Sequence, residues 1–253
     1  MGLSLELETL PAAELLSWAI STYGREFAIA TSFQKEGMII VDLASRAAAP
    51  EAVRVFTLDT GRLPDETYRM IETVRERYGI AVEIVAPDAA DVEQMTGEHG
   101  PNLFYRSPEL RSLCCEVRKV RPMQRKLREF KAWAAGLRRE QSETRANVRK
   151  AEEIDGRIRL APLADWNFGQ VEQYMRENDV PVHPLYMRGY TSIGCGPCTR
   201  AVAPGEDERA GRWWWESPEA VKECGLHFSA DGRAERTVDV LLRDVLSKAL
   251  SHA

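Results

Sequence analysis

Short apolar segments alternate with longer stretches of helical period over the first third of the chain, and this alternation restricts the possible folds most. The stretches at 36–48 and 64–78 have the period of amphipathic helices. The apolar segments around them span residues 26–31, 53–58 and 81–85. Strands separated by helices of this length form βαβ units, so we predict a Rossmann-like parallel sheet with helices on both faces. Ligands of such sheets bind at the carboxyl ends of the strands.

The remainder of the chain has a weaker pattern. The further predicted elements are helices at 14–23, 116–130 and 169–178, a strand at 132–137, and a hairpin at 153–159 that turns at Asp155-Gly156. After about Arg200, proline, glycine and charge interrupt the pattern, and helical period returns only over 236–250. We therefore expect one α/β domain over residues 1–200 and a flexible C-terminal segment over 201–253.

The charge argues against a nucleic-acid-binding protein. The chain has 34 Lys and Arg against 39 Asp and Glu, a net charge of −5, whereas such proteins carry a basic excess. Residues 116–159 hold 14 Lys and Arg against 7 Asp and Glu. This local excess indicates either a small bound anion or a solvated helix face. The apolar runs are far shorter than the ~20 residues that span a bilayer. Because no signal segment opens the chain either, we expect a cytoplasmic protein with no membrane partner.

Cysteine is the most informative residue type chemically, because structural disulfides rarely persist in a reducing compartment. Cys114 and Cys115 are adjacent, and Cys195 and Cys198 form a Cys-x-x-Cys pair. Four thiolates bind zinc or an iron–sulfur cluster. Adjacent cysteines point apart in most backbone geometries, which suits the separated corners of a cubane better than one central ion. The pattern favours a metal centre and leaves both kinds open.

Cys224 lies outside these two pairs. Lys222 and His227 are close in sequence, and nearby cations lower the pKa of a thiol and make it reactive. A single intracellular cysteine is, however, more often an inert, small apolar residue. The residues alone leave both interpretations of Cys224 open.

Three segments carry groups suited to an anion. Thr31 and Ser32 stand between a predicted strand and a predicted helix, where hydroxyl and backbone N–H groups bind anions. Arg209 and Arg212, three residues apart, can present two guanidinium groups to one polyanion. Arg138 follows a predicted strand, in a position where α/β folds often contact ligands. Similar residues also occur in ordinary loops and exposed turns.

Taken together, these motifs resemble those of the assimilatory adenylyl-sulfate (APS) reductases of the iron–sulfur type, within the PAPS/APS reductase family. The motifs are TSFQKE at 31–36, LDTGR at 58–62, CCEVRK at 114–119, GLRREQS at 136–142, GCGPC at 194–198 and ECGLH at 223–227. They occur in the family's order over about residues 20–230.

This resemblance implies a fold similar to the adenine-nucleotide α-hydrolases and a role for each candidate residue. The implied ligands of a [4Fe–4S] cluster are Cys114, Cys115, Cys195 and Cys198. Cys224, on the C-terminal segment, is the implied nucleophile. The nucleotide is expected at Thr31, Ser32 and the backbone near Leu58. The phosphosulfate is expected among Lys119, Arg138, Arg209 and Arg212, with Lys119 between cluster and substrate.

The implied activity is the reduction of APS to sulfite and AMP for cysteine biosynthesis. A thiolate at Cys224 attacks the sulfur of the activated sulfate and displaces AMP. Thioredoxin then releases sulfite from the resulting S-sulfocysteine by thiol exchange. The resemblance also implies a homo-oligomeric enzyme, an oxidoreductase with a disulfide as acceptor.

Several alternatives compete with this interpretation. The nearest is the same reaction on 3′-phospho-APS (PAPS), or on both nucleotides, although the paired cysteines go with APS in the family. An ATP pyrophosphatase-type sulfur-transfer enzyme is less consistent, since such enzymes carry an SGGxDS-type loop where this chain has TSFQKE at 31–36. An iron–sulfur or zinc redox sensor would explain the two pairs of cysteines and leave Cys224 without a role.

Overall fold

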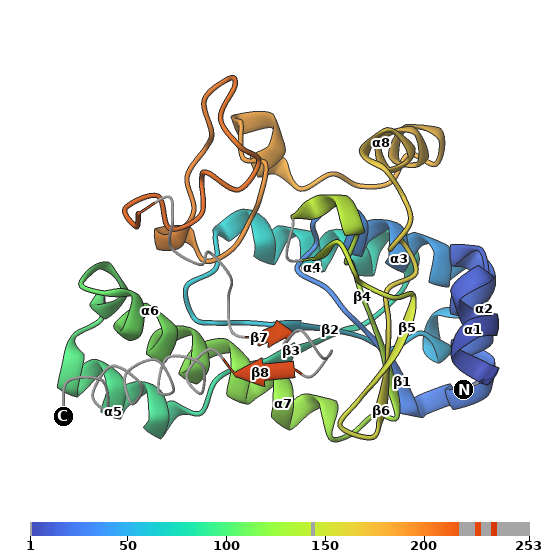
Figure 1. Cartoon of the computed structure of the whole chain (residues 1–253), viewed down its shortest axis with the longest axis horizontal. Helices are drawn as coiled ribbons and strands as arrows, with labels where there is room; N and C mark the ends of the chain where they lie inside the picture. Colours follow the sequence, from blue (N-terminus) through green and yellow to red (C-terminus); the bar gives the residue numbers. More distant parts are fainter. Residues whose placement is uncertain (1, 143–144, 218–225, 229–233, 237–253) are drawn as a thin grey trace.

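The computed structural model describes residues 2–142, 145–217, 226–228 and 234–236. A six-stranded sheet with the order β3-β2-β1-β4-β6-β5 forms its centre (Figure 1). The strands are β1 (Phe27–Ala30), β2 (Val55–Leu58), β3 (Val82–Val85), β4 (Ala132–Ala135), β5 (Ala151–Ile154) and β6 (Arg157–Leu160). All neighbours pair in parallel except β5, an antiparallel edge strand. A separate antiparallel pair joins β7 (Leu226–Phe228) and β8 (Ala234–Arg236).

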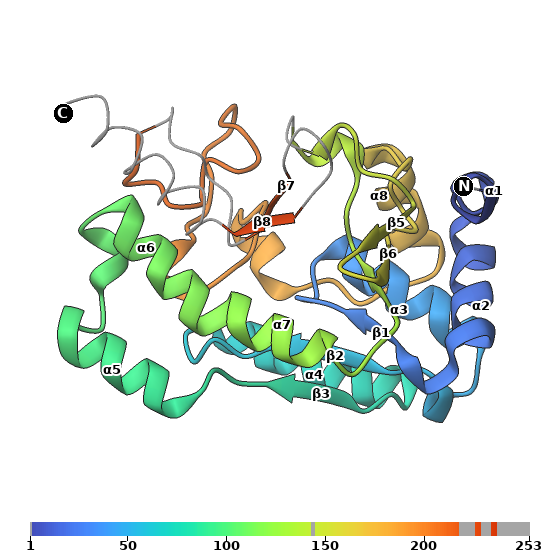
Figure 2. The ribbon, with the colours of Figure 1, turned by 60° about the horizontal axis from the view of Figure 1, so that its bottom comes forward.

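Helices cover both faces of this sheet, as the sequence predicts. They are α1 (Gly2–Thr9), α2 (Ala12–Tyr23), α3 (Lys35–Ala47), α4 (Asp65–Tyr78), α5 (Ala89–His99), α6 (Pro108–Cys115), α7 (Arg121–Leu127) and α8 (Phe168–Glu177). Figure 1 shows α3 and α4 on one side of the sheet and α7 on the other, and Figure 2 shows α6 continuing into α7. Within the described part of the chain, none of these helices has the length and apolar character needed to cross a membrane.

The two faces of the sheet follow from the alternation of side chains along each strand. Ile29 and Val55 are fully buried in the large core formed with α2, α3, α4 and α8. Ala28 and Phe56, one residue along each strand, point the other way and pack with Phe130 and the apolar residues of α7. This burial on both faces explains why the strands read as apolar runs rather than as alternating patterns.

The predicted hairpin is confirmed. Strands β5 and β6 are joined at Asp155 and Gly156, which have φ angles of 50° and 74°. A two-residue turn with positive φ at both positions matches the twist of the flanking strands, which is why Asp-Gly is a strong hairpin signal.

The predicted helix at 116–130 is wrong in its bounds. The helical run begins at Pro108, where the Ser107 side chain accepts the backbone N–H of Leu110, and α7 ends at Leu127. Between α6 and α7 lies a π-helical turn, η4 (Glu116–Val120). Pro122 is tolerated because it falls in the first turn of α7 after this interruption.

Other differences lie at the ends of the chain and between β3 and α6. Helices α1 and α5 were not predicted. Helix α5 is capped at its N-terminus by Asp88, whose carboxylate accepts the N–H groups of Ala90 and Asp91. Arg236, the first residue of the predicted helix at 236–250, instead ends β8. Residues 237–250 lie outside the described residues.

Candidate functional site

The loop after β1 holds the predicted nucleotide-binding residues in a strained conformation. Thr31 is buried, and its hydroxyl accepts the backbone N–H of Phe33 at 2.9 Å. Phe33 is fully buried and has φ 58°, a left-handed conformation that is costly for a bulky residue. Ser32 is exposed, and its hydroxyl accepts from Gln34 Nε2 at 3.0 Å. Strain of this kind persists only where the surroundings hold it, often at ligand sites.

Two glycines allow the end of β4 to approach this loop. A Cβ at Gly136 would lie 2.9 Å from the backbone nitrogen of Gly37, in the first turn of α3. Because real Cβ atoms do not approach so closely, only glycine permits this contact. The carboxyl ends of β1 and β4, which pair in register from Phe27 to Ala30, therefore meet at the start of α3. Leu58 ends the neighbouring strand β2 and is half-buried.

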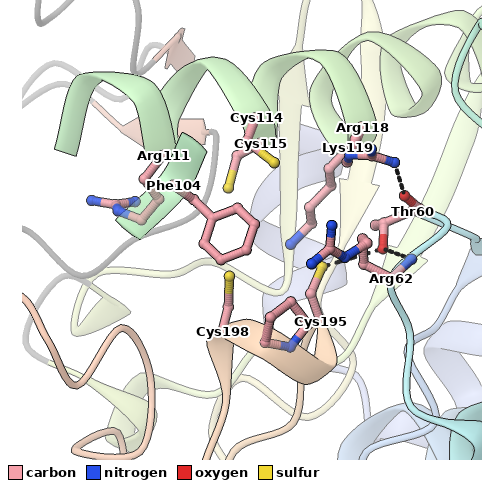
Figure 3. Close-up of a pocket in the computed structure, with 11 residues that line it drawn as sticks. Thr60, Arg62, Phe104, Arg111, Cys114, Cys115, Arg118, Lys119, Cys195 and Cys198 are labelled. Atoms are coloured by element: carbon pink, nitrogen blue, oxygen red, sulfur yellow. Dashed lines mark hydrogen bonds between the residues drawn. The ribbon is translucent and has the colours of Figure 1, made fainter. Parts of the chain in front are cut away.

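The four cysteines of the two pairs line one pocket. Cys114 and Cys115 end α6, immediately before the π turn, a type of interruption frequent at functional sites. Cys195 and Cys198 flank and end a short 3₁₀ turn, η8 (Gly196–Cys198). Figure 3 shows the sulfur atoms of one pair pointing toward those of the other. The pocket is lined by Thr60, Arg62, Phe104, Arg111, Cys114, Cys115, Arg118, Lys119, Cys195, Pro197 and Cys198.

The loop after β2 connects this pocket to the sheet. Thr60 Oγ1 lies 3.2 Å from Cys195 Sγ, and the Thr60 carbonyl accepts from Arg118 Nη1 at 2.9 Å. The Gly196 N–H donates to the Arg62 carbonyl at 2.8 Å. The pocket thus lies at the carboxyl edge of the sheet, where the topology places ligands.

Tyr68 holds the same loop from α4. Its hydroxyl donates to Asp59 Oδ1 at 2.8 Å, and the same carboxylate accepts the Gly61 N–H at 2.8 Å. Burial, followed by this hydrogen bond, raises the pKa of Tyr68 to about 12. The phenol therefore stays protonated and acts as a donor at neutral pH.

Buried N–H donors without a hydrogen-bond partner lie beside the cysteines. Trp213 packs in one apolar cluster with Cys114, Cys195 and Cys198. Within the described structure, Trp213 Nε1 and Arg212 Nε are buried and have no acceptor. Buried donors are normally satisfied, so these two nitrogens are available to an acceptor that the described chain does not supply.

The candidate metal ligands in the pocket are thiols. In the described ranges, no group of three or more His, Cys, Asp or Glu side chains is placed to hold a metal ion. A tetrahedral zinc ion requires its thiolates about 2.3 Å from one point. Four thiols around a shared pocket are a ligand set that fits an iron–sulfur cluster and that also occurs in zinc sites.

The predicted phosphosulfate residues fall into two places. Lys119, in the π turn, lines the cysteine pocket (Figure 3). Arg212 is buried against Trp213, with its guanidinium carbon 4.7 Å from the ring centroid. Arg138 is buried near the loop after β1 instead, where its Nε donates to Glu36 Oε1 at 2.7 Å. The charge of Arg138 is therefore already partly compensated.

The remaining predicted residues are only partly described. Arg209 is half-buried, and its backbone N–H donates to Asp207 Oδ1 at 2.8 Å. Cys224 lies outside the described residues. The role of Cys224 as nucleophile therefore stays a prediction.

Sequence reasoning missed several residues of the pocket. Thr60 and Arg62 belong to a strand-end loop whose motif was noted without roles for them. Arg111 lies one helical turn before Cys114, so it faces the same side of α6, a spacing that offered a signal. Phe104 belongs to a 3₁₀ turn, η3 (Leu103–Tyr105), in which no pattern indicated a site.

Comparison with known proteins gives consistent results. Residues 26–201 match the phosphoadenosine phosphosulfate reductase domain family. The adenosine 5′-phosphosulfate reductase of Burkholderia cepacia is 49% identical over 202 residues, which cover 79% of this chain and 80% of that protein. The enzyme of the same name from Allochromatium vinosum is 45% identical over 231 residues, covering 88% and 89%.

A solved structure supports the fold. The phosphoadenylyl-sulfate (PAPS) reductase of Candida auris, in a phosphate complex, superposes with a TM-score of 0.66 at 29% identity. The match covers 79% of this chain and 94% of that one.

Proposed function

The chain belongs to the phosphoadenosine phosphosulfate reductase domain family, and we propose that it reduces adenylyl sulfate (APS) to sulfite and AMP in sulfate assimilation. The names of relatives at 45–49% identity support APS as the substrate. The observation that carries the proposal is one pocket at the carboxyl edge of the sheet, lined by four cysteines together with Lys119 and several arginines. The pocket thus combines four thiols with the positive charge that a polyanionic substrate requires.

The residues present fit a [4Fe–4S] cluster held by Cys114, Cys115, Cys195 and Cys198. Four thiols from two segments supply its ligand set, and the buried N–H of Trp213 supplies a donor for a sulfur acceptor. When bound, such a cluster supplies a fixed inorganic charge distribution next to the substrate-binding cations. Every step below uses only the groups of the chain, the substrate and a thiol partner.

The first step transfers the sulfonate group to Cys224. The Cys224 thiolate attacks the sulfur of APS, a sulfur–sulfur bond forms, and the bond from sulfur to the bridging phosphate oxygen breaks. The electron pair of that bond leaves with the phosphate, so the products are S-sulfocysteine and AMP. No electrons leave or enter from outside in this step.

Cations are needed because the thiolate and the substrate are both anionic. Two unit charges 4 Å apart repel by about 4 kcal/mol at an effective dielectric constant of about 20, which corresponds to about a thousandfold in rate. Lys119 lines the cysteine pocket from the π turn. Arg212 stacks on Trp213, which belongs to the apolar cluster that includes three of the four cysteines. We propose that Lys119 and Arg212 offset this repulsion and stabilise the charge on the departing phosphate. Arg138, paired with Glu36, and Arg209 complete the proposed phosphosulfate site.

The second step releases sulfite with thioredoxin as the reductant. A thioredoxin thiolate attacks Cys224 Sγ, the bond to the sulfonate group breaks, and its electron pair leaves with sulfite. The second thioredoxin thiol resolves the mixed disulfide and restores the Cys224 thiol. The two electrons of the reduction thus come from the thioredoxin dithiol, which is consistent with the reducing cytoplasm that we propose as the location of the enzyme.

The test is sulfite release from APS plus reduced thioredoxin by the wild type and by Cys224→Ser. We expect turnover by the wild type and none by the variant, with intact-mass detection of a sulfonate on Cys224 when thioredoxin is omitted. Parallel kcat/KM measurements on PAPS distinguish a PAPS-specific or dual enzyme from an APS reductase. Iron content and visible absorbance under exclusion of oxygen test the cluster separately. Colourless, iron-free protein with full activity would exclude it, and undiminished activity in Cys224→Ser would exclude the nucleophile.

A further inference from the structure

A buried ion pair ties the start of the C-terminal segment to the cysteine-bearing helix. Arg111 Nε donates to Glu216 Oε1 at 2.5 Å, and the two side chains are only 4% and 3% exposed. Arg111 lies on α6, one helical turn before Cys114 and Cys115. Glu216 is the second residue from the end of the described stretch 145–217. The mechanism above assigns no role to this pair.

The pair also holds Trp213 and Arg212 in place. Two guanidinium groups lie over the indole ring of Trp213, with Arg111 Cζ 4.5 Å and Arg212 Cζ 4.7 Å from its centroid. The backbone N–H of Trp213 donates to the Cys198 carbonyl at 3.2 Å, and the backbone N–H of Glu216 donates to the Trp213 carbonyl at 3.0 Å. Residues 212–216 therefore contact both the helix that carries Cys114 and Cys115 and the backbone of Cys198.

The backbone conformation and the burial of Trp213 indicate that its surroundings hold it in a strained conformation. Trp213 is 1% exposed and has φ 43°, a left-handed conformation that a bulky residue adopts only when its contacts enforce it. In the described structure, the second carboxylate oxygen of Glu216 is buried without a hydrogen-bond partner. A well-packed pair of apolar side chains often stabilises a fold at least as much as a buried ion pair does, so stability alone does not account for the charges. A role in fixing geometry explains why a charged pair stands here.

We infer that the Arg111–Glu216 pair is the anchor that sets the reach of Cys224 toward the substrate, an inference that rests on the proposed role of Cys224. Cys224 is eight positions after Glu216, and eight residues of fully extended chain span at most about 28 Å. Fixing Glu216 therefore limits how far from this pair the Cys224 thiol can lie. Arg111 and Glu216 are positioning residues: they act through the segment that they hold and through Arg212.

The experiment compares Glu216→Gln and Arg111→Lys with Glu152→Gln as a matched control. Glu152 bonds to the buried Arg159 in the β5–β6 hairpin at one edge of the sheet, so the control also removes the carboxylate of a largely buried ion pair. The readouts are the single-turnover rate of sulfonate transfer to Cys224 at saturating APS, by intact mass, and the APS Kd in a Cys224→Ser background. We expect Glu216→Gln to slow transfer at least tenfold with the Kd within threefold of wild type. Glu152→Gln should match wild type in both readouts.

Arg111→Lys keeps the charge but loses the planar fork that meets both Glu216 and Trp213. It should give an intermediate rate, and it carries the test if Glu216→Gln does not fold. Transfer by the anchor variants at the rate of Glu152→Gln would overturn the inference. A slower transfer rate that a higher APS concentration restores would overturn it as well, because it would trace the defect to substrate binding. Absence of any sulfonate on wild-type Cys224 would instead overturn the proposed function, and the inference with it.

Discussion

Substitution of Gly194 tests whether the position of the Arg212 guanidinium group matters for activity. A Cβ at Gly194 would lie 2.5 Å from Arg212 Cζ and 2.6 Å from Arg212 Nη1, because the guanidinium group lies directly against this glycine. Ordinary van der Waals contact begins near 3.4 Å, so in Gly194→Ala the guanidinium must move by about 1 Å. Trp213, stacked 4.7 Å away, limits the directions open to it.

If Arg212 binds the phosphosulfate as we propose, a displacement of this size costs on the order of 100-fold in rate, or about 2.7 kcal/mol. We expect kcat/KM for APS in Gly194→Ala to fall 10- to 100-fold. The fold should survive, because the atom that must give way is the far end of a flexible side chain. Steady-state kinetics with APS and thioredoxin, together with the thermal midpoint and iron content, measure both effects.

Gly196→Ala is the matched control for this change. Gly196 is in the same Gly-Cys-Gly-Pro-Cys motif and also flanks Cys195, yet a Cβ there would meet only the Arg62 carbonyl oxygen, at 3.7 Å. We expect kcat/KM of this variant to stay within about threefold of wild type, since a contact of that length is unstrained. Equal losses in the two variants would refute the argument, because they would trace the effect to the backbone of the motif rather than to Arg212.

Three further changes test other parts of the structure. Gly136→Ala puts a methyl group 2.9 Å from the backbone nitrogen of Gly37, so denaturant titration should show the free energy of unfolding lowered by about 1–3 kcal/mol; unchanged stability would contradict the close approach. Gln34→Leu removes the side-chain oxygen that accepts the Ile193 N–H at 2.9 Å. Equilibrium binding should show APS affinity reduced about 5- to 10-fold. An unchanged Kd would show that this hydrogen bond does not contribute to APS binding. Burial lowers the pKa of His183 to about 4 from 6.5, so the neutral form stabilises the fold fully above pH 6.5 and this contribution is lost as the pH falls through 4. Between pH 7.5 and 5, unfolding experiments should show about 2 kcal/mol of lost stability that His183→Gln does not lose; identical pH slopes would contradict it.

The strands and helices that build the sheet could be predicted because their signals are local. The period of apolar residues over 26–85 predicted β1, α3, β2, α4 and β3, and Asp155-Gly156 predicted the β5–β6 turn. The helical run before Cys114 was missed, although Ser107-Pro108, a capping serine followed by proline in the first turn, is a local helix-start signal. In contrast, no local pattern distinguishes the π turn at 116–120 from an α-helix, since the difference is one residue in the register of the backbone hydrogen bonds.

The sequence by itself also determined the grouping of Cys114 with Cys115 and of Cys195 with Cys198, since spacing is a property of neighbours. Only the tertiary structure decided what faces these pairs. Thr60 reaches Cys195 across 135 positions of the chain, and Arg138 is paired with Glu36 across 102. Contacts of that kind depend on how strands are ordered in the sheet and which loops share its carboxyl edge. Hydrophobic period specifies each element but not its distant neighbours, so the partners that orient or neutralise a charged group become visible only once the chain is folded.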